Sequence, residues 1–271
     1  MSVESPDPKL DSTVPHPARW YNYWLGGKDN FMADRDFGDA VCDAFPGIVA
    51  TARENRAFLG RLVGHLAREH GVRQFLDIGT GLPTADNVHE VAQRVDPTTR
   101  IVFVDNDPMV LVHAHALLTS TPEGRTAYAD ADLREPDKIL NSAEVIGTLD
   151  LTRPVALLLI AVLHFIPDEA DPYAIVRHLT AGLPPGSFVG ITHGTFDGMD
   201  EPTVTALDGL RTSGNYPFHP RTEEQVVRFF DGLDLLEPGV VNVVDWRPGD
   251  EPNPKTPREE VAGYGGLARL P

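Results

Sequence analysis

Residues 75–84 read Phe75-Leu76-Asp77-Ile78-Gly79-Thr80-Gly81-Leu82-Pro83-Thr84, a short apolar run that leads directly into a glycine-rich turn. Such a turn after the first strand of an α/β sheet lets the backbone approach a ligand closely, and the helix that follows offers unpaired N–H groups. The carboxylate of Asp77, at the end of the run, would suit a ligand that carries an ammonium group. The alternative is a tight strand-to-helix turn that binds no ligand.

On both sides of this stretch, short apolar runs alternate with helical patterns. The runs cover residues 75–78, 101–104, 155–162 and 188–191, and the helical patterns lie near 84–95, 108–119, 171–182 and 222–230. This alternation predicts a mostly parallel sheet with helices on both faces. The run 155–162 has no polar alternation, which is typical of a central strand buried on both sides. The predicted fold class is therefore α/β with a doubly wound sheet.

Changes in composition divide the chain into four segments. We expect a proline-rich, flexible lead (1–17), an N-terminal helical cap (18–71), the sheet domain (72–246) and a C-terminal tail that packs back on the domain (247–271). Between residues 233 and 244, two β-rich pieces separated by Pro238-Gly239 predict a terminal hairpin.

The composition excludes several classes of function. The chain has 271 residues, 41% of them hydrophobic, and a net charge of −17, which argues against a nucleic-acid or anionic-membrane partner. The longest apolar run has nine residues, and a membrane crossing needs about 20. The single cysteine, Cys42, permits neither an intrachain disulfide nor a cysteine-based zinc site. We expect a cytoplasmic protein with no metal site.

Two further acidic residues end predicted strands. Asp105 follows the run 101–104 and could accept both hydroxyls of a ribose, although Asn106-Asp107-Pro108 would equally begin a helix. Asp132 follows the next strand and could accept from an exocyclic amine, while a neighbouring backbone N–H donates to a ring nitrogen. An adenine edge could be bound in this way. The alternative for either acid is a solvated loop residue.

A nicotinamide dinucleotide is the competing ligand for such a sheet. Its pyrophosphate fingerprint needs a third glycine three residues after Gly81, and that position holds Thr84. This departure argues against an NAD-dependent oxidoreductase.

The three strand ends together, Asp77-x-Gly79-x-Gly81, Asp105 and Asp132, resemble the class I S-adenosylmethionine-dependent methyltransferases. The resemblance implies a seven-stranded, Rossmann-like sheet with the methionine end at Asp77 and the glycines, the ribose at Asp105 and the adenine at Asp132. Pro83 departs from the family, many members of which carry a third glycine there. The implied site for S-adenosylmethionine, and for S-adenosylhomocysteine as product, comprises Asp77, Gly79, Thr80, Gly81, Asp105, Asn106, Asp132, Leu133 and Ala161.

The N-terminal segment resembles the opening of a bacterial subfamily of these enzymes. It reads Ala18-Arg19-Trp20-Tyr21-Asn22-Tyr23-Trp24-Leu25-Gly26-Gly27-Lys28-Asp29-Asn30-Phe31, with Asn22 in place of the usual Asp and Trp24 in place of the usual Leu. We interpret it as a lid over the cofactor, with Tyr21, Lys28 and Asn30 facing the site. The alternative is a helix that ends at Gly26-Gly27, followed by a second helix that Asp29 caps.

The stretch after the central strand contains the candidate catalytic residue, His164. It resembles the Leu-His-x-x-x-Asp-Glu of some small-molecule O-methyltransferases, in which the histidine is a general base. The alternative is a histidine that packs under the substrate pocket and bonds a backbone carbonyl. His193, Tyr216 and Tyr264 are predicted to line the acceptor pocket.

These resemblances imply a methyltransferase that acts on a small-molecule acceptor. The alternative from another class is a protein that binds S-adenosylmethionine or S-adenosylhomocysteine without catalysis. The N-terminal opening and the C-terminal stretch 263–267 are both aromatic and rich in glycine. Because ligands bind at the open ends of parallel strands, residues 18–31 and 261–268 could close together over those ends. The alternative is a C-terminus that is simply anchored on the surface.

Overall fold

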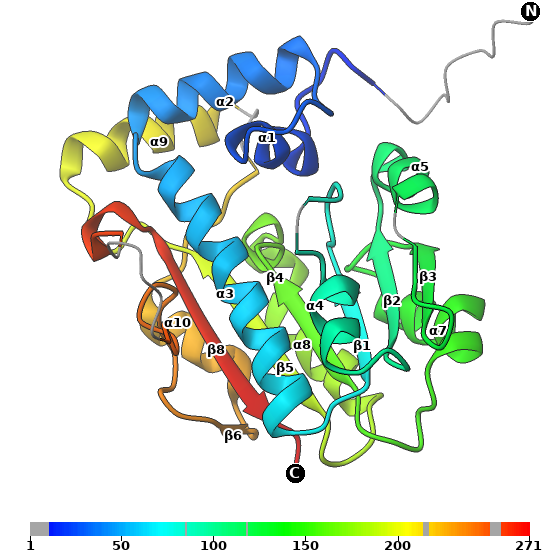
Figure 1. The fold of residues 1–271 in the computed structure, drawn as a ribbon. Helices are drawn as coiled ribbons and strands as arrows, with labels where there is room; N and C mark the ends of the chain where they lie inside the picture. Colours follow the sequence, from blue (N-terminus) through cyan, green and yellow to red (C-terminus); the bar gives the residue numbers. More distant parts are fainter. Residues whose placement is uncertain (1–10, 85, 118, 214–216, 250–255) are drawn as a thin grey trace, which may run out of the picture.

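The fold is an α/β sheet with helices on both faces and a helical cap at one end (Figure 1). A computed structural model describes residues 11–84, 86–117, 119–213, 217–249 and 256–271. Among the helices in these ranges, none combines the length and the apolar character that a membrane crossing requires.

Five parallel strands form the larger part of the sheet and confirm the predicted fold class. They are β1 (Gln74–Ile78), β2 (Arg100–Asp105), β3 (Arg125–Asp130), β4 (Ala156–Ile160) and β5 (Phe188–Gly194). The order across the sheet is β3-β2-β1-β4-β5-β8-β6. Every residue of β1 and β4 is buried, as the unbroken apolar run in β4 predicts.

The other edge of the sheet corrects two predictions. The expected C-terminal tail supplies β8 (Gly263–Arg269), which pairs antiparallel with β5 inside the sheet. The two β-rich pieces near 233–244 form β6 (Asp234–Leu235) and β7 (Val241–Asn242), and each pairs with β8. The prediction of a hairpin is therefore wrong. The two short strands form their backbone hydrogen bonds with the seven-residue strand β8 instead of with each other.

Helices cover the two faces of the sheet with separate apolar clusters. On one face, α3 (Ile48–Glu69) and α4 (Val88–Val95) pack through residues such as Phe58 and Leu62. On the other face lie α7 (Ala143–Thr148), α8 (Pro172–Ala181) and α10 (Glu223–Val227). The remaining elements of these layers are α5 (Pro108–Leu117), α6 (Pro136–Leu140), η1 (Leu163–Phe165), η2 (Asp168–Ala170), η3 (Arg228–Phe230) and η4 (Arg258–Glu260).

A third apolar cluster joins the cap to the strand ends. The cap consists of α1 (Pro17–Trp24), α2 (Met32–Ala44) and α9 (Glu201–Thr212), which gather at the end toward which the arrow of β4 points (Figure 1). Trp20 packs on Phe37 with ring centroids 4.5 Å apart. Gly26, with φ +81°, follows the end of α1, but the residue that precedes α2 is Phe31 rather than the expected Asp29.

The described part of the N-terminal lead is tied to the molecule by Arg19. The buried guanidinium of Arg19 donates hydrogen bonds to the carbonyls of Asp11 and Val14 and lies 3.5–3.7 Å from the carboxylates of Asp107 and Asp34. The backbone N–H of His16 also donates to Asp34. Residues 11–16 are therefore fixed against the cap, whereas residues 1–10 lie outside the described part.

Candidate functional site

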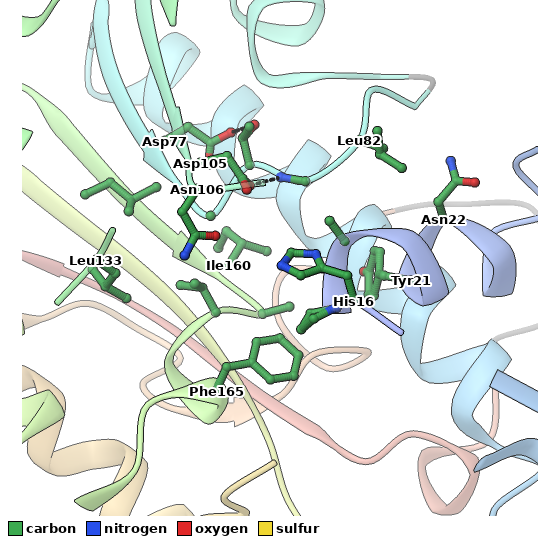
Figure 2. Close-up of a pocket in the computed structure, with 18 of the residues that line it drawn as sticks. His16, Tyr21, Asn22, Asp77, Leu82, Asp105, Asn106, Leu133, Ile160 and Phe165 are labelled. Carbon is green, nitrogen blue, oxygen red and sulfur yellow. Dashed lines mark hydrogen bonds between the residues drawn. The ribbon is translucent and has the colours of Figure 1, made fainter. Parts of the chain in front are cut away.

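A cavity of about 480 Å³ lies between the ends of the parallel strands and the N-terminal segment. Figure 2 shows Asp77, Asp105 and Asn106 on one side, and His16 and Tyr21 on the other. The cavity is large enough for a cofactor, and its place at the carboxyl ends of the strands is the usual place for ligands in such sheets.

The turn after β1 depends on its glycines. Gly79 has φ +74°, and a Cβ atom there would lie 2.5 Å from Cγ2 of Val162. Gly81 has φ +66°, and its N–H donates to Oδ2 of Asp105 at 2.8 Å. The turn therefore needs glycine conformations and also joins the ends of β1 and β2.

Two buried carboxylates face this cavity. Asp77 is 5% exposed, and within the described part of the chain only the Thr80 hydroxyl donates to it, at 2.8 Å. Asp105 is 8% exposed and accepts from the N–H groups of Gly81 and Asp107. Burial raises the pKa of Asp77 to about 6 and also raises the pKa of Asp105. Both side chains can accept hydrogen bonds from ammonium or hydroxyl groups in the cavity.

The third acidic strand end also reaches the cavity, but its carboxylate is already engaged. Asp132 accepts from Nε and the backbone N–H of Arg134 at 2.9 and 2.8 Å, and from the amide of Asn106 at 3.0 Å. The Arg134 hydrogen bond lowers the pKa of Asp132 to about 2. Leu133 is nearly buried beside it.

The structure brings most of the predicted cofactor residues together around this one cavity. The lining includes Tyr21, Asp77, Gly79, Thr80, Gly81, Asp105, Asn106, Asp132, Leu133 and Ala161. Lys28 is exposed and Asn30 binds the turn itself, donating to Oδ1 of Asn22 and to the carbonyl of Gly27, each at 3.0 Å. The prediction that Lys28 and Asn30 face the site is therefore corrected, because the amide of Asn30 is used to close the Gly26-Gly27 turn.

Several lining residues were not predicted from sequence. His16 comes from the supposed lead, and Nδ1 of its ring lies 2.8 Å from Oδ2 of Asp107. Asn55 and Arg56 come from α3. Asn55 is 7% exposed within the apolar stripe of that helix, and this polar interruption is the signal that could have identified it.

A second cavity, of about 70 Å³, adjoins the first beneath the cap. Both cavities share Tyr21, Asn55, Ala161 and Phe165. Ala161, directly after β4, has φ +54°, a strained conformation for a residue with a side chain. The walls of the second cavity are mostly apolar, and they include the aromatic residues Trp20, Trp24, Phe45, Phe196 and Phe218.

His164 lines the second cavity, but its hydrogen bond argues against the role of base. Nδ1 accepts from the N–H of Gly194 at 3.2 Å, so we assign the ring proton to Nε2. Burial, together with His193 and Arg221, lowers the pKa of His164 well below its usual value. These observations favour the alternative that His164 packs under the substrate pocket. Its backbone partner, however, is the N–H group of Gly194 rather than the expected carbonyl.

The other predicted acceptor residues differ in position. His193 lines the second cavity, whereas the hydroxyl of Tyr264 donates to Asp197 at 3.1 Å and is not part of either cavity lining. The prediction for Tyr264 is corrected, because the side chain packs with the core on the other side of β8. Tyr216 lies outside the described residues.

Arg221, which was not predicted from the sequence, holds the segment around His164 and the side chain of His193 in place through hydrogen bonds. It is 3% exposed and donates to the carbonyls of Leu163 and Ile166, to Oδ1 of Asp168 and to Nε2 of His193. Nδ1 of His193 therefore carries the proton and donates to the carbonyl of Gly194 at 2.7 Å. Burial lowers the pKa of His193 to about 3, so its imidazole is neutral.

The strand order and the three acidic strand ends around one cavity agree with the class of α/β methyltransferases that the sequence resembles. The chain belongs to the S-adenosyl methyltransferase family, whose family model matches residues 3–271. A search of curated proteins found no match.

Two solved structures are similar to nearly the whole chain. A DUF574 family protein from Streptomyces avermitilis is 46% identical over 96% of this chain and 99% of its own, with a TM-score of 0.92. A protein from Thermobifida fusca assigned as a methyltransferase is 40% identical over 99% of both chains, with a TM-score of 0.87. The chain is accordingly an S-adenosylmethionine-dependent methyltransferase.

A more distant structure agrees in fold alone. The N-methyltransferase NodS of Bradyrhizobium japonicum, in complex with S-adenosyl-L-homocysteine, is 14% identical over 93% of this chain and 96% of its own, with a TM-score of 0.50. This likeness supports the strand arrangement and carries no information on the acceptor.

Proposed function

We propose that this chain binds S-adenosylmethionine in the large cavity and transfers the methyl group to a small molecule in the second cavity. The observation that carries the proposal is the junction of the two cavities at Ala161 and Phe165, opposite two buried carboxylates. The cofactor supplies an activated methyl group on a sulfonium, and the protein positions the acceptor for displacement.

Each part of the cofactor has a suitable partner. Asp77 holds the methionine ammonium, and Asp105 accepts the ribose hydroxyls. Arg56, which lines the same cavity and lies close enough to Asp77 to favour its charged form, interacts with the methionine carboxylate. Asp132 and Leu133 contact the adenine, with the Asp132 carboxylate shared between the adenine amine and Arg134.

The N-terminal segment closes the cofactor from the other side. Tyr21 and Asn22 line the cavity from α1, and His16 lines it from the segment before. The Tyr21 hydroxyl donates to the carbonyl of Ala52 and accepts from the amide of Asn55, so its position is fixed. We assign this segment the role of excluding water from the reacting atoms.

The acceptor is a small molecule rather than a nucleic acid or a membrane lipid. The second cavity is narrow and aromatic, and the net charge of −17 opposes association with a polyanion. A cytoplasmic location is consistent with a single cysteine and with the cofactor.

Calorimetric titration with S-adenosylhomocysteine tests the cofactor assignment. Asp105→Ala removes charge-assisted hydrogen bonds to the ribose and should weaken binding by about 1.5–3 kcal/mol. Asp130→Ala is the matched control, because Asp130 pairs with Asp105 in register on β3 but is exposed and outside the cavity lining. A folded Asp105→Ala variant that binds as tightly as the control would refute the ribose assignment.

A further inference from the structure

None of the described residues that line the second cavity has a side chain able to remove a proton at neutral pH. Its polar lining residues are Tyr21, Thr51, Asn55, His164, Thr192, His193 and Thr195, and none of its described lining residues is an acid, a lysine or an arginine. The hydroxyl of Tyr21 is held between Ala52 and Asn55, and burial raises its pKa further. With no base among these described residues, we expect a hydroxyl acceptor to lose its proton to water before transfer.

His164 offers this cavity a hydrogen-bond donor. Because Nδ1 accepts a hydrogen bond from the N–H of Gly194, the ring proton lies on Nε2. Among the described residues, none makes a hydrogen bond to Nε2. The residue is 8% exposed and lines the cavity. The aromatic rings of Phe165 and Phe218 pack against the imidazole, with centroids 4.3 and 5.0 Å away. An unpartnered N–H in such surroundings is suited to an acceptor atom on a bound molecule.

The groups around His164 keep its proton in place. His193 has its own proton fixed on Nδ1 by Gly194 and Arg221. Arg221 adds a buried positive charge, and burial lowers the pKa of the nearby His219. The pKa of each imidazole in this group lies below its usual value, which favours the neutral ring and keeps the donor at His164 in place.

Resting on the proposed function, we propose that the acceptor is a small, weakly acidic hydroxy compound, such as a phenol, that binds in the second cavity as its oxyanion. The oxyanion accepts a hydrogen bond from Nε2–H of His164. His164 is therefore a residue that positions and stabilises the nucleophile, not a base.

Charge balance distinguishes this acceptor from an amine. A neutral amine would become a cation on methylation, in an apolar cavity whose described lining has no carboxylate to pair with it. When the nucleophile is an oxyanion, its oxygen forms the new bond to the methyl carbon and the electron pair of the broken carbon–sulfur bond stays on sulfur. The products, a methyl ether and a thioether, are both neutral, as an apolar cavity favours.

The test uses 4-nitrophenol, whose phenolate has a visible absorption band, and sinefungin, an analogue with an ammonium group in place of the sulfonium methyl. With sinefungin bound, the wild-type protein should bind the probe as phenolate and lower its apparent pKa by about one unit, because the donor and the cation favour the charged form. Binding of the neutral phenol with an unchanged or raised pKa, or no binding of the probe, would overturn the inference.

Variants assign the effect to the imidazole. His164→Leu should reduce the pKa shift of the probe to the part that the sinefungin ammonium supplies, whereas His164→Gln, which retains an N–H donor, should keep more of it. His178→Leu is the control, because His178 lies half-exposed on α8, where it pairs with Asp137. An equal shift in wild type and folded His164→Leu would refute the role of His164.

Calorimetry with sinefungin alone separates this inference from the proposed function. If the protein binds sinefungin but not the probe, only the proposed acceptor class is refuted. If it does not bind sinefungin, the cofactor site is refuted as well.

Discussion

Gly79 occupies a backbone conformation that costs other residues free energy. Gly79→Ala should lower the free energy of unfolding by at least about 1–2 kcal/mol, because φ is +74° and the new Cβ would collide with Val162. Gly60→Ala on α3 is the control, since a Cβ there meets open space, and it should stabilise the protein by about 0.5–1 kcal/mol. Urea unfolding measures both. A neutral Gly79→Ala would contradict the geometry described for this turn.

The buried carboxylate of Asp77 should make cofactor binding depend on pH. Its pKa is about 6, so the side chain gains a proton as the pH falls through that value and loses its attraction for an ammonium group. The dissociation constant for S-adenosylhomocysteine should therefore rise by up to about tenfold per pH unit below pH 6 and be nearly constant from pH 7 to 8. Asp105, whose pKa is also raised, acts in the same direction.

Calorimetry across this pH range, with Asp77→Asn for comparison, measures the effect. The variant should bind weakly at pH 7 and show a shallower change toward low pH. Wild-type affinity that stays constant down to pH 5 would show that Asp77 does not pair with an ammonium group.

Single residues were predictable from sequence where a strand and a turn set their position. Asp77, Asp105 and Asp132 each end a strand, and β1, β2 and β3 are neighbours in the sheet. His16, Arg56 and Arg221 were missed because tertiary contacts, not local patterns, bring them to the site. The proton position on His164 depends on Gly194, thirty residues away in sequence, which no motif around His164 reveals.

At the scale of elements, the two chain ends have different roles. The aromatic α1 covers the large cavity, whereas residues 263–269 form β8 in the interior of the sheet. Sequence similarity between the two glycine-rich ends suggested a common lid, but strand pairing between β5 and β8 joins residues some 75 positions apart and leaves no local signal. The glycines of β8 allow close packing instead: a Cβ at Gly265 would lie 2.6 Å from Phe58.

Hydrogen exchange should separate these roles. On addition of S-adenosylhomocysteine, backbone amides in residues 18–25 should become more protected, because α1 lines the cavity and closes on the ligand. Amides in β8 should show no change, since they are already bonded within the sheet. Increased protection of both α1 and β8 would support a lid formed by the two chain ends. Unchanged exchange in α1 would show that α1 does not close on the ligand.

At the scale of the whole molecule, Arg19 connects the cap to the cofactor site. It contacts Asp34 in α2 and Asp107, whose N–H donates to the ribose candidate Asp105. The alternating pattern of runs and helices predicted the sheet beneath, and the N-terminal opening was interpreted as a lid over the cofactor. The sequence did not indicate that His16, before that opening, would also line the cavity. Because the sheet and the N-terminal segment together form the site, cofactor binding and the position of the cap should be coupled.

The central claim is that the large cavity holds S-adenosylmethionine with its sulfur directed toward the second cavity. A crystal structure with S-adenosylhomocysteine tests it most directly. We predict the methionine ammonium at Asp77, the ribose hydroxyls at Asp105, and the sulfur beside Ala161 and Phe165, facing the aromatic cavity. Density for the ligand elsewhere, or with its sulfur turned away from the second cavity, would contradict the account.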